Sequence, residues 1–181
     1  MAEKASPILP EELKIEIIHF QHELSCFTSY EKDLVDFLKD DALANQEQNL
    51  SVTFVWFYQN QLVSYLTLLN DRITLSGDLH KYFKDKGIIY KTLPALKIGR
   101  LCVDDRFRGR GLGTLMLRFA VQIAKEINQS KAGCRFITVD AKRNCNPALD
   151  SIKFYQKLPF KIFGEKPKEN ITFMYLDLKL V

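Results

Sequence analysis

The chain has 181 residues, of which 46% are hydrophobic and 27% are charged, and its formal net charge is +4. At this length folding can bury roughly 70% of the surface of the unfolded chain, so a full apolar core is available. This composition excludes a disordered tail, a collagen-like fibre and a small scaffold built on disulfides.

The first half of the chain predicts a strand, a helix and a hairpin. Residues 13–20 are mostly apolar and β-branched, which favours a strand. A capping-box pattern over residues 28–31 and apolar residues at helical spacing after it predict a helix that ends near residue 46. The aromatic and β-branched runs 52–58 and 62–69 predict a β-hairpin, and a short helix is expected over residues 79–83.

The second half has a clearer pattern. Residues 96–103 predict a buried strand, and residues 104–109 form a charged loop after it. From Leu112 to Ile127 apolar residues recur at i, i+3, i+4 and i+7, which predicts an amphipathic helix. Strands over residues 133–141, 161–163 and 171–178 and a helix over residues 148–157 follow. The element order predicts an α/β fold with helices on the faces of one sheet.

The two halves of the sequence differ in charge. Residues 1–90 hold 8 basic and 14 acidic side chains, a net charge of −6, whereas residues 91–181 hold 18 and 8, a net charge of +10. A basic half suits a nucleic acid, a phosphorylated cofactor or an acidic protein, and an unevenly charged solvated surface fits the same numbers.

The cysteines and histidines indicate an intracellular chain without a metal site. None of the four cysteines forms a C-x-x-C pair, and the N-terminus lacks the apolar core of a signal peptide, so we expect reduced thiols and a cytoplasmic location. The apolar runs are shorter than the roughly 20 residues that span a bilayer. His19 and His22 are three residues apart, but no acidic or thiol partner completes a recognisable ligand spacing, so we expect no metal.

The segment with the most specific chemistry is the glycine-rich turn over residues 108–114, Arg-Gly-Arg-Gly-Leu-Gly-Thr, between a strand and the long helix. Glycines let a ligand approach the backbone, and the first N–H groups of a helix bind anions. The turn lacks the lysine of a Walker A loop, and its glycine spacing is not that of a dinucleotide fingerprint. Arg106, Arg108 and Arg110 add positive charge at its mouth.

The pattern R-x-x-G-x-G, residues 108–113, resembles the pyrophosphate loop of the GNAT acyltransferases. The resemblance extends over nearly the whole chain: residues 98–104 look like the fourth strand of that family, residues 139–141 like the fifth, and residues 154–157 like the helix that bears a catalytic tyrosine. It implies one GNAT domain over residues 1–181. Its fold would be a mixed, mostly antiparallel sheet of about six to seven strands with helices on both faces.

The resemblance also implies an activity: an N-acetyltransferase that moves an acetyl group from acetyl-CoA to a primary amine by direct attack, without a metal. Tyr155 would be the general acid that protonates the leaving thiolate, and a backbone N–H near Val103 would stabilise the oxyanion. The alternative for Tyr155 is a core aromatic beside Phe154, and Cys102 is either inert packing or an acyl-accepting nucleophile. The implied acetyl-CoA-binding residues are Leu101, Cys102, Val103, Arg108, Gly109, Arg110, Gly111, Leu112, Gly113 and Thr114.

Residues 27–38, 42–46 and 53–55 look like a branch of that family, the toxin–antitoxin acetyltransferases that acetylate the α-amine of aminoacyl-tRNA. That branch implies a charged-tRNA acceptor and an antitoxin partner, and a homodimer is compatible with it. The chain departs from it in about five additional residues before Phe154, including residues 143–147, and in Pro159-Phe160, where Gly-Phe is usual. Two alternatives therefore stay open: an acetyltransferase for a protein or small-molecule amine, and a non-catalytic acyl-CoA-binding module.

Overall fold

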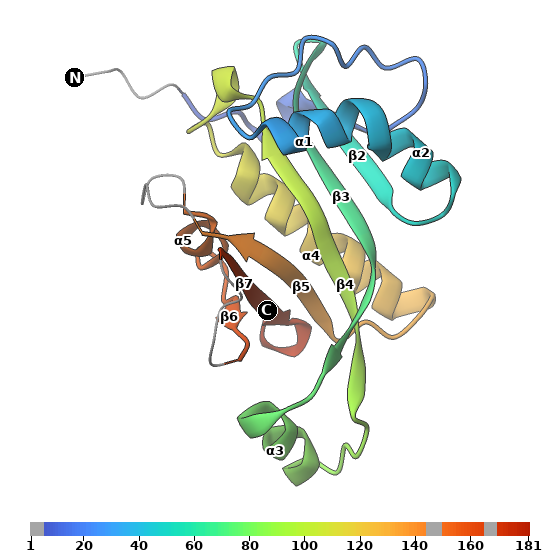
Figure 1. Ribbon diagram of the computed structural model, residues 1–181, viewed down its shortest axis with the longest axis vertical. Coiled ribbons are helices and arrows are strands. Elements are labelled where there is room, and N and C mark those ends of the chain that lie inside the picture. The colour runs from blue at the N-terminus through green and yellow to red at the C-terminus, as the bar shows by residue number, and fades with distance from the viewer. Residues whose placement is uncertain (1–5, 144–149, 165–169) are drawn as a thin grey trace, which may run out of the picture. The chain divides into compact units, whose positions relative to one another are not determined.

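The structure is a computed structural model, and it describes residues 6–143, 150–164 and 170–181. Its strands are β1 (Leu13–Ile17), β2 (Val52–Tyr58), β3 (Gln61–Thr74), β4 (Thr92–Val103), β5 (Phe136–Lys142), β6 (Lys161–Ile162) and β7 (Ile171–Asp177). Its α-helices are α1 (Lys32–Asp36), α2 (Ala42–Glu47), α3 (Gly77–Asp85), α4 (Leu112–Ser130) and α5 (Ser151–Tyr155) (Figure 1). None of the described helices is long and apolar enough to cross a membrane.

The strands form one sheet in the order β1-β2-β3-β4-β5-β7-β6, in which β1–β2, β2–β3, β5–β7 and β6–β7 are antiparallel. The predicted α/β class with a mostly antiparallel sheet is therefore confirmed. The residues group into two compact units: unit 1 comprises Met1–Leu69 and Ile98–Ala120, and unit 2 comprises Asn70–Lys97 and Val121–Val181.

The predicted hairpin of unit 1 is confirmed, with a tighter turn than expected. Tyr58 pairs with Gln61, so only Gln59 and Asn60 lie between the strands. Both have positive φ, 49° and 61°, which is the conformation of the two-residue turn that matches the twist of a hairpin. Strand β3 continues to Thr74, five residues beyond the predicted end.

The predicted helix of unit 1 is interrupted by a π-helical segment. The capping box is wrong, because the helix begins at Lys32 and Thr28 bonds to Asp104 instead. Residues Phe37–Asp41 are π-helical, and the Ala42 N–H donates to the Phe37 carbonyl. The Tyr65 hydroxyl donates to the Leu34 carbonyl, in the turn of α1 before this segment, at 2.7 Å.

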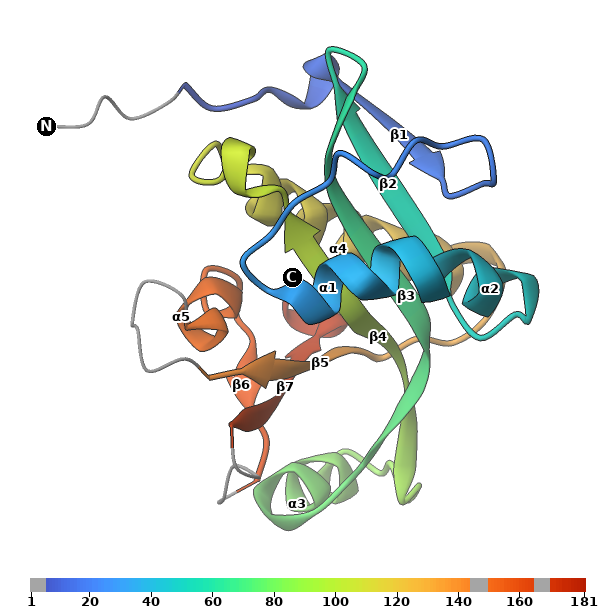
Figure 2. The same cartoon turned by 45° about the horizontal axis from the view of Figure 1, so that its top comes forward.

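Unit 1 has apolar packing on both faces of β2. The segment from α1 to α2 lies across β2 and β3 (Figure 2), where Phe37 and Ala42 join Val55 in one core cluster. From α4, Phe119 packs edge-on against Trp56, with ring centroids 5.6 Å apart. Because neighbouring residues of a strand point to opposite faces, the continuous apolar run of β2 is explained by burial on both sides.

Unit 2 has its own aromatic core. Phe83 of α3 lies 5.8 Å from Phe136 of β5, which in turn lies 5.5 Å from Tyr175 of β7. Strand β7 runs between β5 and β6 (Figure 1). Helix α5 is shorter than predicted: it begins at Ser151, where the Asp150 carboxylate accepts from the Ile152 N–H. Ala148, the expected first residue of this helix, lies outside the described residues, as do residues 144–147 of the predicted insertion.

Candidate active site

The glycine-rich turn joins β4 to α4 in unit 1. After Val103 the chain makes a 3-10 turn over Asp105–Phe107, and α4 begins at Leu112. Gly109 and Gly111 have φ values of +76° and +88°, a conformation that other residues adopt only with strain. A Cβ at either glycine would meet no atom within 4 Å, so the space in front of the turn is open. Open backbone of this kind before a helix N-terminus is compatible with the predicted anion site.

The three arginines of the turn are tied to protein partners. The Arg106 guanidinium donates to both carboxylate oxygens of Asp104 at 2.9 Å, and Arg108 donates to Asp105 at 2.6 Å. Arg110 donates to the Ser6 carbonyl at 2.9 Å. Residues 104–110 thus carry a net charge of only +1, less than the arginines alone suggest. A ligand bound at this turn, as predicted, would meet a partly neutralised loop and the N-terminus of helix α4.

Two of these arginines also cover aromatic rings. Arg108 lies 4.2 Å from the ring centroid of Tyr30, and Arg110 lies 5.0 Å from that of Tyr58. Cation–π contacts of this kind fix the planes of the guanidinium groups at the surface. The turn is therefore held from the side by residues of the N-terminal part of unit 1.

Asp104 is a structural centre that the sequence alone did not single out. Its side chain is fully buried and accepts from the Thr28 N–H and the Arg106 N–H, both at 2.9 Å, besides the Arg106 guanidinium. Burial by itself raises the pKa of this carboxyl, but the hydrogen bonds from Arg106 and Thr28 outweigh it, so the pKa is lowered. The available signal was the Asp-x-Arg spacing directly after a buried strand. Asp104 anchors the start of the turn to the segment before α1.

The end of β4 supplies the next predicted ligand-binding residues. Leu101 and Val103 are half-buried and Cys102 is buried. Burial raises the pKa of the Cys102 thiol to about 11, so the thiol stays protonated at neutral pH. This favours packing over the nucleophilic role as the explanation of Cys102.

Tyr155, the predicted general acid, is the last residue of α5 in unit 2. Its side chain is buried, and its ring packs between Phe154 at 5.1 Å and Phe160 at 5.5 Å. Burial raises the pKa of its hydroxyl above the usual value, so the phenol is protonated throughout the physiological range. Within the described ranges the hydroxyl has no hydrogen-bond partner. The role of Tyr155 and the set of ligand-binding residues remain predictions.

The basic surplus belongs mainly to unit 2. Unit 1 has nine basic and 13 acidic side chains, a net charge of −4, and unit 2 has 17 and nine, a net charge of +8. The glycine-rich turn itself lies in unit 1. The basic side chains after it include Lys142, Arg143, Lys153, Lys157 and Lys161 of unit 2, which are exposed, and Lys166 and Lys168, which lie outside the described residues.

Unit 2 also has a groove of about 440 Å³, and its lining includes none of these cations. It is lined by Pro94, Lys125, Asn128, Gln129, Gly133, Cys134, Arg135, Leu178 and Lys179. None of the predicted site residues is in this set, and the Arg135 guanidinium is paired with Asp177 at 2.7 Å. We therefore assign it no part in the chemistry.

Comparison with known proteins gives a consistent family match. Residues 17–160 match the Acetyltransferase (GNAT) family. Among curated proteins, the chain is similar to a tRNA-acetylating toxin of Mycobacterium tuberculosis, with 28% identity over 148 residues, which cover 80% of this chain and 82% of the relative.

Solved structures show the same fold. A tyrosine-to-phenylalanine mutant of KacT has a TM-score of 0.75 and 21% identity, and the match covers 93% of this chain and 96% of that one. AtaT complexed with acetyl-methionyl-tRNAfMet has a TM-score of 0.74 and 22% identity, with the same coverage. AtaTR bound with AcCoA also has a TM-score of 0.74 and 22% identity, with 94% and 96% covered.

Proposed function

Because this chain belongs to the acetyltransferase (GNAT) family, it is an N-acetyltransferase, and we propose that its acceptor is the α-amine of aminoacyl-tRNA. One observation carries the proposal: the similarity to a tRNA-acetylating toxin extends over 80% of this chain and 82% of the relative. The family match over residues 17–160 includes both the turn before α4 and helix α5, rather than a cofactor motif alone. In this proposal the protein acts in the cytoplasm and has an antitoxin as its partner.

Acetyl-CoA is the acetyl donor in this proposal, and it supplies the acetyl group as a thioester. The backbone of residues 108–114 fits its pyrophosphate, because two left-handed glycines leave open space before the N-terminus of α4. Leu101, Cys102 and Val103 would hold the pantetheine arm along the edge of β4. Arg108 and Arg110 keep their planes fixed and lose little side-chain freedom on binding.

Tyr155 would act on the leaving group. Its phenol is always protonated, so it can donate to the sulfur as the thiolate departs, with no need for a particular pH. No glutamate lies in residues 96–103, where a base would be expected. An aminoacyl ester suits such a site, since its α-amine has a lower pKa than a lysine side chain and is more often neutral.

The exposed cations of unit 2 support a polyanionic acceptor. Unit 2 carries a net charge of +8, more than the phosphates of one CoA require. Binding of a tRNA acceptor stem would be dominated by phosphate contacts and would weaken steeply with salt.

The test is a parallel transfer assay with labelled acetyl-CoA. Charged tRNA, free amino acids, spermidine and a lysine-containing peptide are offered at equal amine concentration. The proposal expects acetylated aminoacyl-tRNA as the main product and slow transfer to the other amines. If the enzyme acetylates a free amine but not charged tRNA, the proposed acceptor is wrong. The assignment as an acetyltransferase would be unaffected. Acetyl-CoA binding without transfer to any amine would favour a non-catalytic acyl-CoA-binding module.

A further inference from the structure

We propose that Glu16, His19 and His22 form a binding site for a borderline divalent metal ion such as Zn²⁺. One ligand atom from each side chain lies within 4.8 Å of the other two. Two nitrogen ligands on a tetrahedral zinc stand about 3.3 Å apart, given Zn–N distances of about 2.0–2.1 Å. The three ligand atoms would therefore need to approach one another by at most about 1.5 Å. Glu16 supplies the acidic partner that the histidine spacing did not reveal.

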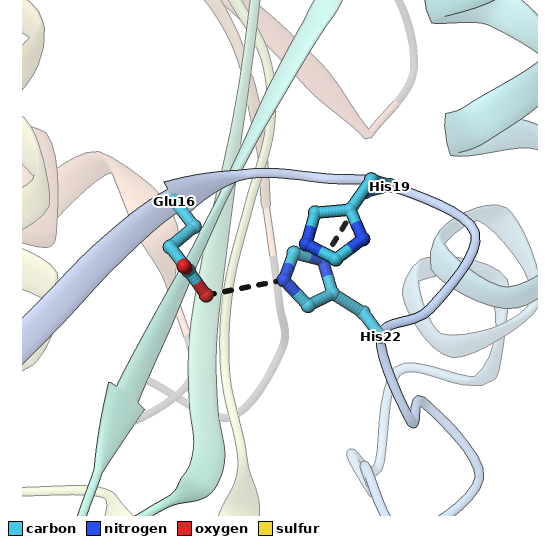
Figure 3. Close-up of side chains that lie close together, drawn as sticks. All are labelled: Glu16, His19 and His22. Atoms are coloured by element: carbon cyan, nitrogen blue, oxygen red, sulfur yellow. Dashed lines mark hydrogen bonds and ion pairs between the residues drawn. The ribbon is translucent and has the colours of Figure 1, made fainter.

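The end of β1 and the turn after it bring these side chains together. Glu16 pairs with Val55 in the sheet, and the Ile18 N–H still donates to the Thr53 carbonyl, so the chain leaves the sheet only after Ile18. A turn closed by the His22 N–H and the His19 carbonyl then reverses the chain. As Figure 3 shows, the His22 imidazole comes to lie between His19 and the Glu16 carboxylate.

The site is anchored on one side and accessible on the other. His22 has a side chain that is only 7% exposed, and its ring lies 5.2 Å from that of Phe57. His19 is exposed, and its ring is tilted by 36° against that of His22, with ring centroids 3.5 Å apart. The exposed His19 ring would swing away from His22 when both nitrogens bind one ion. Lys14 pairs with Oε1 of Glu16 at 2.9 Å, which leaves Oε2 directed at Nε2 of His22, 3.2 Å away. A metal ion could reach this oxygen and both imidazoles from the exposed side.

Hydrogen bonds define the protonation of the metal-free site. The His19 N–H donates to Nδ1 of His22 at 3.1 Å, and the Gln21 N–H donates to Nδ1 of His19 at 3.3 Å. In a neutral ring the proton must then be on Nε2, and that of His22 is donated to Glu16. A metal on Nε2 replaces this proton, which moves through solvent to Nδ1. Both backbone hydrogen bonds are lost, but they lie on an exposed turn, where water can replace the lost partners.

The donor set selects the class of metal. Two imidazole nitrogens and one carboxylate oxygen suit Zn²⁺, Co²⁺ or Ni²⁺, whereas Mg²⁺ and Ca²⁺ prefer sites made of oxygen. Three protein ligands leave a fourth position for water. The bound ion would connect the end of β1 to the loop that leads to Thr28.

The experiment is a calorimetric titration of the full, metal-stripped and tag-free chain with ZnCl₂. Wild type and His80→Ala should bind one ion per chain; His80 is the third histidine of the chain and lies on α3 of unit 2. His19→Ala and Glu16→Gln should bind more weakly by a factor on the order of 10 or more, and MgCl₂ should give no binding. Equal affinity in His19→Ala and His80→Ala would overturn the site.

Nitrogen-15 spectra of the histidine rings give a second readout that does not depend on the variants. Without metal, His19 and His22 should show the Nε2–H tautomer, and one equivalent of Zn²⁺ should convert both to Nδ1–H while His80 stays unchanged. Binding that leaves both tautomers as they are would refute coordination through Nε2. Neither experiment uses acetyl-CoA or an acceptor, so a negative result here leaves the proposed function untouched.

Discussion

Asp104 shows how one buried carboxylate supports the glycine-rich turn. It accepts five hydrogen bonds, two from Thr28 and three from Arg106, and they fix both the backbone after β4 and the side chain of Arg106. The Arg106 guanidinium is therefore paired within the protein. The arrangement also makes the turn sensitive to the charge of a single group.

We predict that Asp104→Asn destabilises the protein by about 2 kcal/mol at pH 7, since hydrogen bonds to a buried charge are lost and a side-chain N–H faces other donors. The lowered pKa of Asp104 means that its contribution is fully present above the unfolded pKa of about 3.9 and is lost as pH falls through the lower folded pKa. Urea denaturation of wild type and Asp104→Asn should therefore show a difference in the free energy of unfolding that becomes smaller below about pH 4.

Asp105→Asn is the matched control. Its pair with Arg108 is partly exposed, so the change should cost less than about 1 kcal/mol. If both variants lose the same free energy of unfolding, the burial of Asp104 adds nothing to its stabilising effect.

For Tyr155→Phe we predict a fall in kcat by a factor of about 10²–10⁴ with the Kd for acetyl-CoA nearly unchanged, because one hydroxyl is removed from a ring whose packing stays the same. Steady-state transfer and calorimetric binding of acetyl-CoA measure the two quantities. Tyr82→Phe, at a half-exposed ring on α3, is the control and should leave both unchanged. An unchanged kcat in Tyr155→Phe would mean that Tyr155 is a core aromatic residue and not the general acid.

At the scale of elements, the turn before α4 depends on two left-handed glycines with open space before them. We predict that Gly111→Asp abolishes acetyl-CoA binding, because a carboxylate would occupy the phosphate site and the backbone would be strained by about 1–2 kcal/mol. Gly87→Asp has a similar φ of +75° and equally open surroundings, so it imposes a comparable strain elsewhere. Thermal shifts with and without acetyl-CoA should show destabilisation in both variants and loss of the ligand effect in Gly111→Asp alone. A retained ligand effect in Gly111→Asp would rule out the turn as the phosphate site.

The sequence predicted the elements whose signals are local. The period of apolar residues from Leu112 to Ile127 located α4 within a few residues, and the apolar runs on both sides of Gln59 located the hairpin. The glycine turn could be predicted as an anion site because it depends on backbone conformation, which glycine spacing encodes.

What the sequence did not predict depends on contacts between distant residues. The π-helical segment coincides with a bond from Tyr65, which is 31 residues from Leu34. The spacing of Thr28 to Glu31 predicts a helix cap, yet Thr28 donates its N–H to the buried carboxylate of Asp104, 76 residues away. The partners of Arg106, Arg108 and Arg110 were missed for the same reason, and they reduce the charge that these residues present to a ligand.

At the scale of the molecule, the uneven charge of the two units gives the acceptor hypothesis a direct test. We predict that the triple variant Lys142/Arg143/Lys157→Ala loses transfer to aminoacyl-tRNA and has a shallower dependence on salt, because each lost phosphate contact lowers the slope by about one. Transfer to a small free amine should not change. The variant Lys81/Lys84/Lys86→Ala removes the same charge from α3 and is the control. Equal losses in both variants would indicate a general field effect rather than a tRNA-binding surface.

The position of β7 has a consequence for the order in which the sheet can form. Strand β7 follows both β5 and β6 in the sequence, yet it lies between them and supplies a pairing partner to each. Until Ile171–Asp177 takes its place, β5 lacks its β7 neighbour and β6 lacks the strand with which it pairs. The two earlier strands therefore reach their final pairing only after the later one has joined them.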